Sequence, residues 1–426
     1  DIRKKLIFTF LMLVVVRFGS QLPIPGANRD YFQAWFAQQT GDAFNFFDAF
    51  TGGSFTSMSL FALGITPYIT SSIIVQLLTI AIPKLEEMQK DGEDGRKKIQ
   101  TISRYLTVAL ALIESIAMTV GFGSRGLLAA NTIPNKIVVI AAMTAGSAFL
   151  MWIGEEITEH GVGNGISIVL LINIVSRIPD DFVTLFDQFM KGQTILNAVV
   201  AAVVIIAVVL VTVVFVIFLQ DGERRIPVQY AKKMQGRKMV GGQSTNIPLK
   251  VNTAGVIPVI FASSLMSFPN VIASLLGKTG GTGIGSKIMT GLSQSSWCDP
   301  SRPIYSLGLV LYIVLVVFFA YFYTSITFNP IEISNNMKRQ GGFIPGIRPG
   351  KPTTEYLSRI LNYIVFIGAV GLIIVCVIPI FFNGMFGANV SFGGTSIIII
   401  VGVVLETLKQ IESQMLVRYY KGFLND

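Results

Sequence analysis

Long apolar segments separated by short polar stretches recur along almost the whole chain. A transmembrane helix needs about 20 mostly apolar residues. Ten segments approach or exceed that length, and they cover roughly residues 3–22, 58–82, 101–121, 137–155, 163–178, 195–219, 251–276, 304–328, 356–382 and 392–412. The fifth is short, and we include it because the charge pattern after it would otherwise invert. The pattern predicts an all-α polytopic membrane protein with ten transmembrane helices.

Ten spans divide evenly into an N-terminal half, residues 1–178, and a C-terminal half, residues 179–426. Because each half has an odd number of spans, the second half has to run inverted relative to the first. Inverted repeats are common among transport proteins, which place the working site between the repeats. We therefore expect two inverted five-helix halves with the functional site at their interface.

Lysine and arginine are unequally divided between the two sides of the predicted membrane domain. With the N-terminus placed inside, 24 of the 33 Lys and Arg residues fall on inner segments. Cytoplasmic segments of membrane proteins carry an excess of these residues. Both termini are therefore expected in the cytoplasm.

The composition agrees with a membrane protein and excludes several kinds of site. The chain is 52% hydrophobic and 13% charged, whereas an average soluble domain is about 25% charged. Two cysteines and one histidine, His160, argue against a disulfide framework and a multi-histidine metal site. GGTGIGSK at 280–287 has its last residues in the wrong order for a phosphate-binding loop. We expect no catalytic residues, no metal and no cofactor.

Few ionisable residues lie within the predicted spans, and Arg17 in the first and Glu114 in the third are the ones well inside the membrane. Charges inside a membrane are costly and are functional candidates by default. A structural ion pair between the two is the simpler interpretation, because pairing is the usual remedy for a buried charge. A proton relay through Glu114 is the alternative, but no partner acid or histidine accompanies it.

The second apolar segment contains helix breakers at its centre. The stretch ALGITPYITSSII carries Gly64 and Pro67, and its isoleucines follow at every fourth position. Ile65, Ile69 and Ile73 share one helix face at this spacing. Similar aliphatic groups occur near the middle of three other spans, at Ile166, Leu170 and Ile174, at Ile257 and Ile260, and at Ile397 to Ile400. Aliphatic residues are common in all spans, so this pattern alone gives weak support for a pore.

Two inner loops, residues 220–250 and 329–356, are longer than the topology requires. In the first, Ile226, Val228 and Tyr230 alternate with Pro227 and Gln229 before a turn signal, which predicts a projecting β-hairpin. In the second, prolines and glycines bracket Arg348. Basic loops also bind anionic lipid without specific structure. The ordered turns favour a docking surface for an acidic or RNA-bearing partner.

Several long motifs in these loops and spans resemble the bacterial SecY family, the main subunit of the Sec translocon. The motifs are YAKKMQGRKMVGGQSTNIPLKVNTAGVIPVIFASS, FIPGIRPG, LFALGITPYITSSIIVQLL and MWIGEEITEHGVGNGIS, within a resemblance that runs nearly end to end. The resemblance implies a central pore that passes unfolded secretory proteins across the bacterial plasma membrane and releases transmembrane segments sideways into lipid. It also implies SecE and SecG subunits, and a SecA motor ATPase or a ribosome docked on the cytoplasmic loops.

The resemblance also assigns roles to individual positions. The family places a constriction ring of aliphatic residues at positions that match Ile65, Ile69, Leu170, Ile260 and Ile399. Such side chains can exclude ions by dewetting and still yield to a passing chain. Residues 41–57 are too polar to span, and in the family this stretch folds back as a plug. Its candidate residues are Phe44, Asn45, Phe46, Phe47, Gly52 and Gly53, with the two glycines as a hinge.

Two further groups follow from the same resemblance. Spans two and three meet spans seven and eight at a lateral gate, where Thr70, Gln76 and Asn252 are candidates for a weak polar contact. Ordinary helix packing by small polar residues explains them equally well. The candidates for motor or ribosome docking are Arg237, Lys238, Lys250, Arg348 and Lys351.

A secondary transporter for a small solute is the competing function, because it shares ten spans and inverted halves. Such a transporter needs polar or ionisable groups converging near the bilayer midplane, and this chain has aliphatic residues there. A selective ion channel needs a carbonyl filter or a charged ring, and the sequence contains neither pattern.

Overall fold

The computed structural model describes residues 1–38, 48, 51–235, 238–240, 242, 244–276, 282–293, 296–387 and 394–423. Within these residues, ten long helices correspond to the ten apolar segments, which confirms the predicted fold class. They are α1 (Ile2–Gly19), α4 (Thr66–Ala81), α6 (Glu93–Phe122), α7 (Ile133–His160), α8 (Gly165–Phe189), α9 (Ile195–Asp221), α10 (Ile257–Leu275), α12 (Leu307–Thr327), α14 (Lys351–Phe386) and α15 (Gly394–Phe423).

A test of helix length, hydropathy and charge identifies fewer membrane spans than the ten long helices of the structure. Among the described residues, five helical segments are long and apolar enough to cross a membrane, or six if α4 and the short helix after it form one bent span. α1 falls outside this group with four Lys and Arg residues, and the middle of α8 carries Arg177, Asp180 and Asp181. Charged groups inside helices lower their apparent hydropathy, and they also mark positions of interest.

Shorter elements connect the long helices. These are α2 (Arg29–Gln38), α5 (Pro83–Lys90), η1 (Gly123–Leu127), α11 (Ile284–Gly291), η3 (Pro303–Ser306), α13 (Pro330–Arg339), β1 (Glu223–Tyr230), β2 (Lys233–Gln235), β3 (Lys238–Val240), β4 (Ser244–Lys250) and β5 (Gly342–Phe343). β1 pairs with β4 and with β5, both antiparallel, and β2 pairs with β3. The predicted hairpin in the first long loop is therefore confirmed, and the second long loop adds a strand to it.

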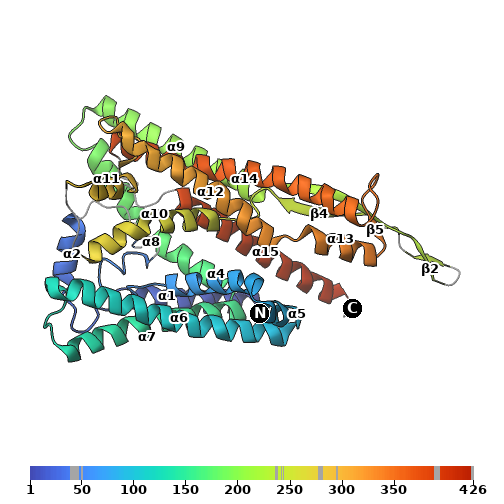
Figure 1. Cartoon of the computed structure of the whole chain (residues 1–426), viewed down its shortest axis with the longest axis horizontal. Helices are drawn as coiled ribbons and strands as arrows, with labels where there is room; N and C mark the ends of the chain where they lie inside the picture. The colour runs from blue at the N-terminus through green and yellow to red at the C-terminus, as the bar shows by residue number, and fades with distance from the viewer. Residues whose placement is uncertain are drawn as a thin grey trace.

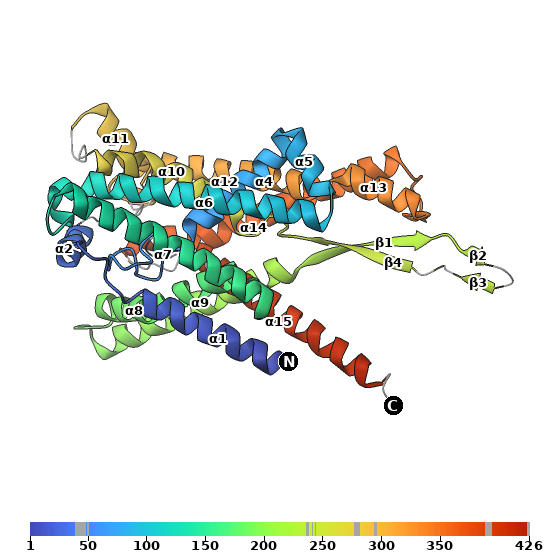
Figure 2. The same ribbon diagram turned by 90° about the horizontal axis from the view of Figure 1, so that it is seen from below.

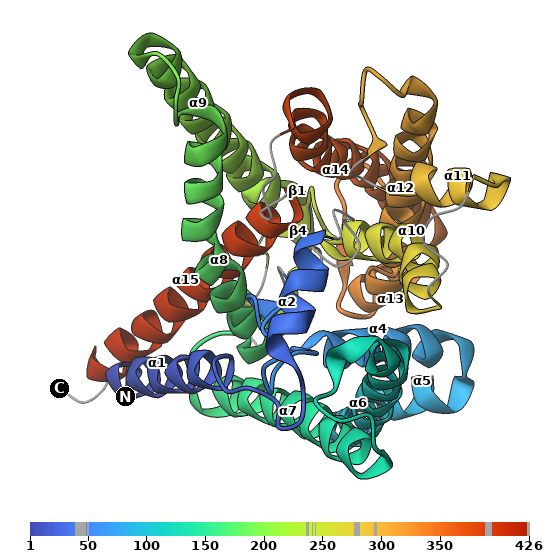
Figure 3. The ribbon, with the colours of Figure 1, turned by 90° about the vertical axis from the view of Figure 1, so that its left-hand side faces the viewer.

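The helices run along one common direction, so the molecule has two distinct ends. The strands project from one end, toward which the N- and C-termini also lie, and α2 and α11 lie at the opposite end (Figures 1 and 2). Seen from the α2 end, α1, α4, α6 and α7 group on one side, and α10, α12 and α14 group on the other (Figure 3). This arrangement is the one expected for two halves that face each other.

Two predicted boundaries differ from the structure. The second apolar segment was expected to begin near residue 58, with Gly64 and Pro67 marking where its helix resumes. α4 begins at Thr66 with Pro67 in its first turn, and residues 52–65 are mostly turns. Proline fits the first turn of a helix because its missing N–H would have no partner there. α8 continues to Phe189, so a division after residue 178 would cut this helix. The two-half organisation itself remains a prediction.

The two largest apolar clusters of the core lie between the long helices. The first joins α1, α4, α7 and α8 with Ile399 and Val403 of α15. The second lies among α9, α10, α12, α14 and α15. α9 instead exposes much of its apolar surface, as at Val203, which is 59% exposed. An exposed face of this kind suits contact with lipid rather than water.

Candidate functional site

The five aliphatic residues assigned to the ring lie in or against one cluster. Ile65, Leu170 and Ile399 are buried in the first apolar cluster, and half-buried Ile69 and Ile260 pack against it. They come from four separate regions of the chain, namely the start of α4, α8, α10 and α15. Because α10 and α15 belong to the second half, the cluster joins the two halves. The structure thus brings the predicted residues together, and their action as a pore ring stays a prediction.

Local backbone bonds position these side chains. Ile65 precedes α4, and its carbonyl accepts a hydrogen bond from the N–H of Ile69 at 3.2 Å, so the two side chains lie one turn apart. At the start of α8 the side chain of Asn164 accepts from the N–H of Ile166 at 3.2 Å. Asparagine is a favoured residue at this position because it satisfies otherwise free N–H groups.

Asp48 and residues 51–57 are the described part of the predicted plug, and together with residues 58–64 they form a compact, largely buried segment that we call the plug segment. It is tied to the residues after α1 by hydrogen bonds from Ile24 N to Met58 O at 3.1 Å and from Leu60 N to Leu22 O at 3.0 Å. The hydroxyl of Ser147 on α7 donates to the carbonyl of Gly64 at 3.2 Å. The segment therefore rests on the first half. The predicted plug residues Phe44, Asn45, Phe46 and Phe47 lie outside the described residues.

The two glycines of the plug segment occupy a conformation that other residues rarely adopt. Gly52 has φ +65° and Gly53 has φ +83°. Both lie in the left-handed region, where glycine has no steric penalty. A Cβ on Gly52 would also come 2.8 Å from Nη1 of Arg17 and 3.0 Å from the backbone of Asn173. The glycines form a tight turn here, and their proposed role as a hinge remains a prediction.

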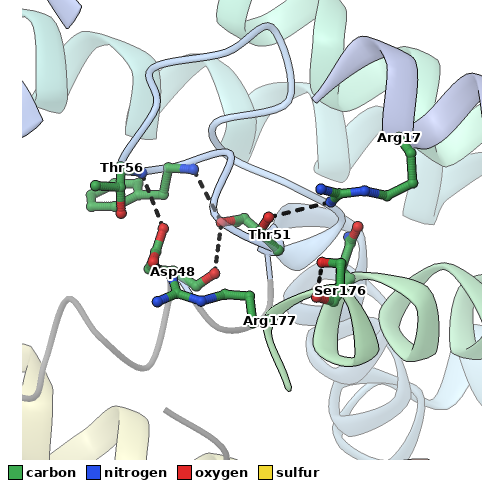
Figure 4. Close-up of polar contacts among 9 residues, drawn as sticks. Arg17, Asp48, Thr51, Thr56, Ser176 and Arg177 are labelled. Carbon is green, nitrogen blue, oxygen red and sulfur yellow. Dashed lines mark hydrogen bonds and ion pairs between the residues drawn. The ribbon is translucent and has the colours of Figure 1, made fainter. Parts of the chain in front are cut away.

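Polar contacts gather where the plug segment meets α1 and α8 (Figure 4). Arg17 donates from Nη1 to the carbonyl of Gly52 at 3.2 Å, and Arg177 of α8 forms an ion pair with Asp48. The predicted pair between Arg17 and Glu114 is wrong, because the ion pairs among the described residues do not include it and Arg17 points to the plug segment instead. The proton relay through Glu114 is untested.

Sequence reasoning missed the pair between Asp48 and Arg177. Asp48 stands in a polar stretch, and Arg177 was counted only as a basic residue near a span end. The available signal was that each charge is flanked by apolar residues, FF before Asp48 and an isoleucine beside Arg177. Charges in such surroundings usually have a partner.

The residues assigned to the lateral gate are dispersed. Thr70 is half-buried on α4, Gln76 is exposed on α4, and Asn252 is buried just before α10. The backbone at Asn252 lies against Gly368 of α14. Helices α6 and α10 meet across the two halves. No hydrogen bond among the described residues joins Thr70 to Asn252, and the polar contact stays a prediction.

The docking candidates lie at the end of the molecule that carries the strands. Lys250 ends β4, Arg348 and Lys351 flank the start of α14, and all three are exposed. Lys238 starts β3, and Arg237 lies outside the described residues. An apolar cluster that includes Ile226, Leu249, Met337 and Leu357 joins the two long loops beneath them. The described parts of the two loops therefore pack together, and we call them the strand platform.

The turn that carries Arg348 is fixed by its neighbours. Gly346 and Gly350 have φ +83° and +101°. The hydroxyl of Thr353 donates to the carbonyl of Arg348 at 2.7 Å, and that of Ser334 on α13 donates to the carbonyl of Gly350 at 2.9 Å. The guanidinium is thus displayed from an ordered backbone, which suits recognition of a carboxylate or a phosphate.

Potential metal ligands are few among the described residues. Glu156, Glu159 and His160 place their ligand atoms within 4.8 Å of one another at the end of α7. His160 is exposed and lies 3.2 Å from Glu156 one turn earlier. Exposed acidic groups of this kind are common on helix ends, and we assign them no metal function.

Comparison with known proteins identifies the family of the chain. The SecY family model matches residues 59–408. The chain belongs to the SecY family. The protein translocase subunit SecY of Halalkalibacterium halodurans is 44% identical over 435 residues, covering 100% of this chain and 97% of the relative.

Solved structures show the same fold. A SecY protein whose plug domain stabilises the closed state of its translocation channel and maintains a membrane seal matches with TM-score 0.64 at 20% identity, covering 97% of this chain and 93% of that chain. Sec61 in a canine ribosome-channel complex from the endoplasmic reticulum matches with TM-score 0.62 at 19% identity and the same coverage. This SecY-family chain is accordingly a multi-pass membrane protein.

Proposed function

We propose that this SecY-family protein is the channel through which unfolded secretory proteins cross the bacterial plasma membrane. Transmembrane segments leave the same channel sideways into lipid. The observation that carries the proposal is the single aliphatic cluster in which Ile65, Ile69, Leu170, Ile260 and Ile399 meet from both halves, with the plug segment against it. An apolar constriction of this kind can exclude ions by dewetting while remaining deformable.

The proposal includes an orientation and a division of labour. The chain through α8 and the chain from α9 onward act as two halves, and both termini face the cytoplasm with the strand platform. This orientation is supported by the excess of Lys and Arg on that side. The plug segment closes the ring from the outer side. Thr70, Gln76 and Asn252 adjust the stability of the lateral gate, through which signal sequences leave.

The driving force comes from partners that dock on the platform. A SecA motor ATPase or a translating ribosome binds at Arg237, Lys238, Lys250, Arg348 and Lys351. Basic residues on an ordered surface attract acidic proteins and RNA. SecE-type and SecG-type subunits complete the channel.

Protease protection tests this function. The protein is placed in liposomes with a SecE-type subunit, and motor, ATP and a secretory precursor are added. We expect precursor to become protected from protease only when ATP is present. If no precursor is protected although motor binding and correct folding are shown separately, the channel function is wrong.

A further inference from the structure

We propose that Asp48 and Arg177, supported by Arg17, form a latch that holds the plug segment closed and sets how strongly a signal sequence has to act to open the channel. The proposal rests on the channel function proposed above. It assigns to two arginines of the first half a role in selecting which precursors are transported. We call the contact of these three residues with the plug segment the plug latch.

Asp48 organises the plug segment and anchors it at the same time. Its Oδ2 pairs with the guanidinium of Arg177, while its Oδ1 accepts a hydrogen bond from the N–H of Thr56 at 3.0 Å. Its carbonyl accepts from the N–H of Gly53 and from the hydroxyl of Thr51, both at 3.1 Å. One residue therefore closes the turn and connects that turn to α8 (Figure 4).

Arg17 holds the same turn from the side of α1. Its Nη1 donates to the carbonyl of Gly52 at 3.2 Å, and the glycine lies between this guanidinium and the backbone of Asn173 on α8. Only a residue without a Cβ fits there in the left-handed conformation. The turn is consequently enclosed between α1 and α8 and bonded to an arginine from each.

Because the ion pair between Asp48 and Arg177 is buried, breaking it costs free energy, and this cost opposes release of the plug segment. The side chain of Asp48 is 2% exposed and that of Arg177 is 26% exposed. Removing one partner of such a pair leaves an uncompensated buried charge, which is far more costly than losing an exposed pair. The plug segment is therefore stable in place while the pair is intact and strongly destabilised once the pair breaks.

The described polar anchors of the plug segment all lie on the first half. They are Arg17 on α1, Ser147 on α7 and Arg177 on α8, with Leu22 in the connection after α1. Separation of the two halves would leave these contacts in place. Release of the plug segment thus requires a second event, in which the entering chain displaces the turn from between α1 and α8.

The test measures transport of two precursors, one with an intact signal sequence and one with a weakened signal sequence. The variants are Asp48→Asn, Arg177→Gln and the double substitution in the full channel complex. Each single variant is expected to raise transport of the weakened precursor about tenfold, corresponding to about 1.4 kcal/mol. Transport of the intact precursor should change less than twofold. The double variant should raise it no more than either single variant, because all three remove the same contact and the double variant leaves no buried charge without its partner.

Two matched controls separate the plug latch from general damage. Lys191→Gln breaks an exposed ion pair between Lys191, which follows α8, and Asp187 in the last turn of α8, the helix that also carries Arg177. Ser54→Ala removes a buried hydroxyl of the plug segment that has no hydrogen-bond partner among the described residues. Neither change should alter the ratio of the two precursors. A merely structural role for Arg177 would instead lower transport of both precursors together.

The outcomes are distinct for each claim. An unchanged precursor ratio in both single variants overturns the plug latch, and so does a double variant whose effect is the sum of the two. If Arg177→Gln does not assemble, Arg177→Lys retains the charge without the fork of the guanidinium and should give a smaller rise in the ratio. No rise in that variant or in Asp48→Asn also overturns the proposal. If the unmodified protein transports neither precursor, the proposed channel function fails instead.

Discussion

Replacing Ile69 and Ile260 by serine tests the aliphatic ring with little risk to the fold. The two residues come from α4 and α10, on opposite halves, and both are half-buried at the edge of the first apolar cluster. Full burial of an isoleucine side chain contributes about 1.5–3 kcal/mol. Half-burial therefore contributes about 1 kcal/mol per residue, and the double substitution should cost about 2 kcal/mol of stability.

The effect on the seal has a separate cause. Each serine hydroxyl can hydrogen-bond to water in a constriction that is otherwise apolar, which contributes about 1 kcal/mol net. Two hydroxyls would lower the barrier to water by about 2 kcal/mol, or roughly thirtyfold in ion leak. The leak arises because an apolar constriction blocks ions by remaining dry.

Single-channel current or ion flux from proteoliposomes measures the leak of the closed channel. Ile373→Ser is the matched control, because Ile373 is equally half-buried but packs on α14 against the second apolar cluster. As a single substitution it should lose about half as much stability as the double variant, about 1 kcal/mol, without a leak. If the double variant leaks no more than Ile373→Ser, the reasoning about the ring is wrong.

Three further predictions concern the lateral gate, the strand platform and Cys298. Thr70→Val combined with Asn252→Leu should change how hydrophobic a signal sequence has to be for transport, and an unchanged requirement would remove the polar contact at the gate. Arg348→Glu should weaken binding of the motor at least tenfold, as measured by co-sedimentation, while Arg302→Glu, on an exposed residue outside the strand platform, should leave it unchanged. Burial raises the pKa of the Cys298 thiol, so its thiolate fraction at pH 7 is low and maleimide labelling from the outer side should be slow and should accelerate with pH. Labelling that is fast at pH 7 or occurs only from the inner side would contradict this.

The long helices were predictable because their signal is local. An apolar segment of about 20 residues can be recognised from its composition alone. The alternation of Ile226 and Val228 predicted the hairpin from a similarly local pattern. The residue at which α4 begins was harder to predict from hydropathy. Residues 58–65 are as apolar as the helix that follows, but the left-handed Gly64 and the proline at 67 confine the helix to the residues after them.

Contacts between distant parts of the chain could not be predicted from local pattern. The partner of Arg17 is the backbone of Gly52, and a carbonyl group leaves no mark in a sequence. The partner of Arg177 is Asp48, which lies far away along the chain. β5 joins β1 although each comes from a different loop. Such pairings depend on how the helices pack.

The most direct test of the central claim is to ask what a precursor touches while it is arrested in the membrane. The two cysteines, Cys298 and Cys376, are replaced by serine, and single cysteines are introduced at Ile69, Ile399 or the lipid-facing Val203. The account predicts disulfide crosslinks from a cysteine in the arrested precursor to positions 69 and 399 and none to position 203. Crosslinks to position 203 without any to the ring would show that the chain crosses by another route.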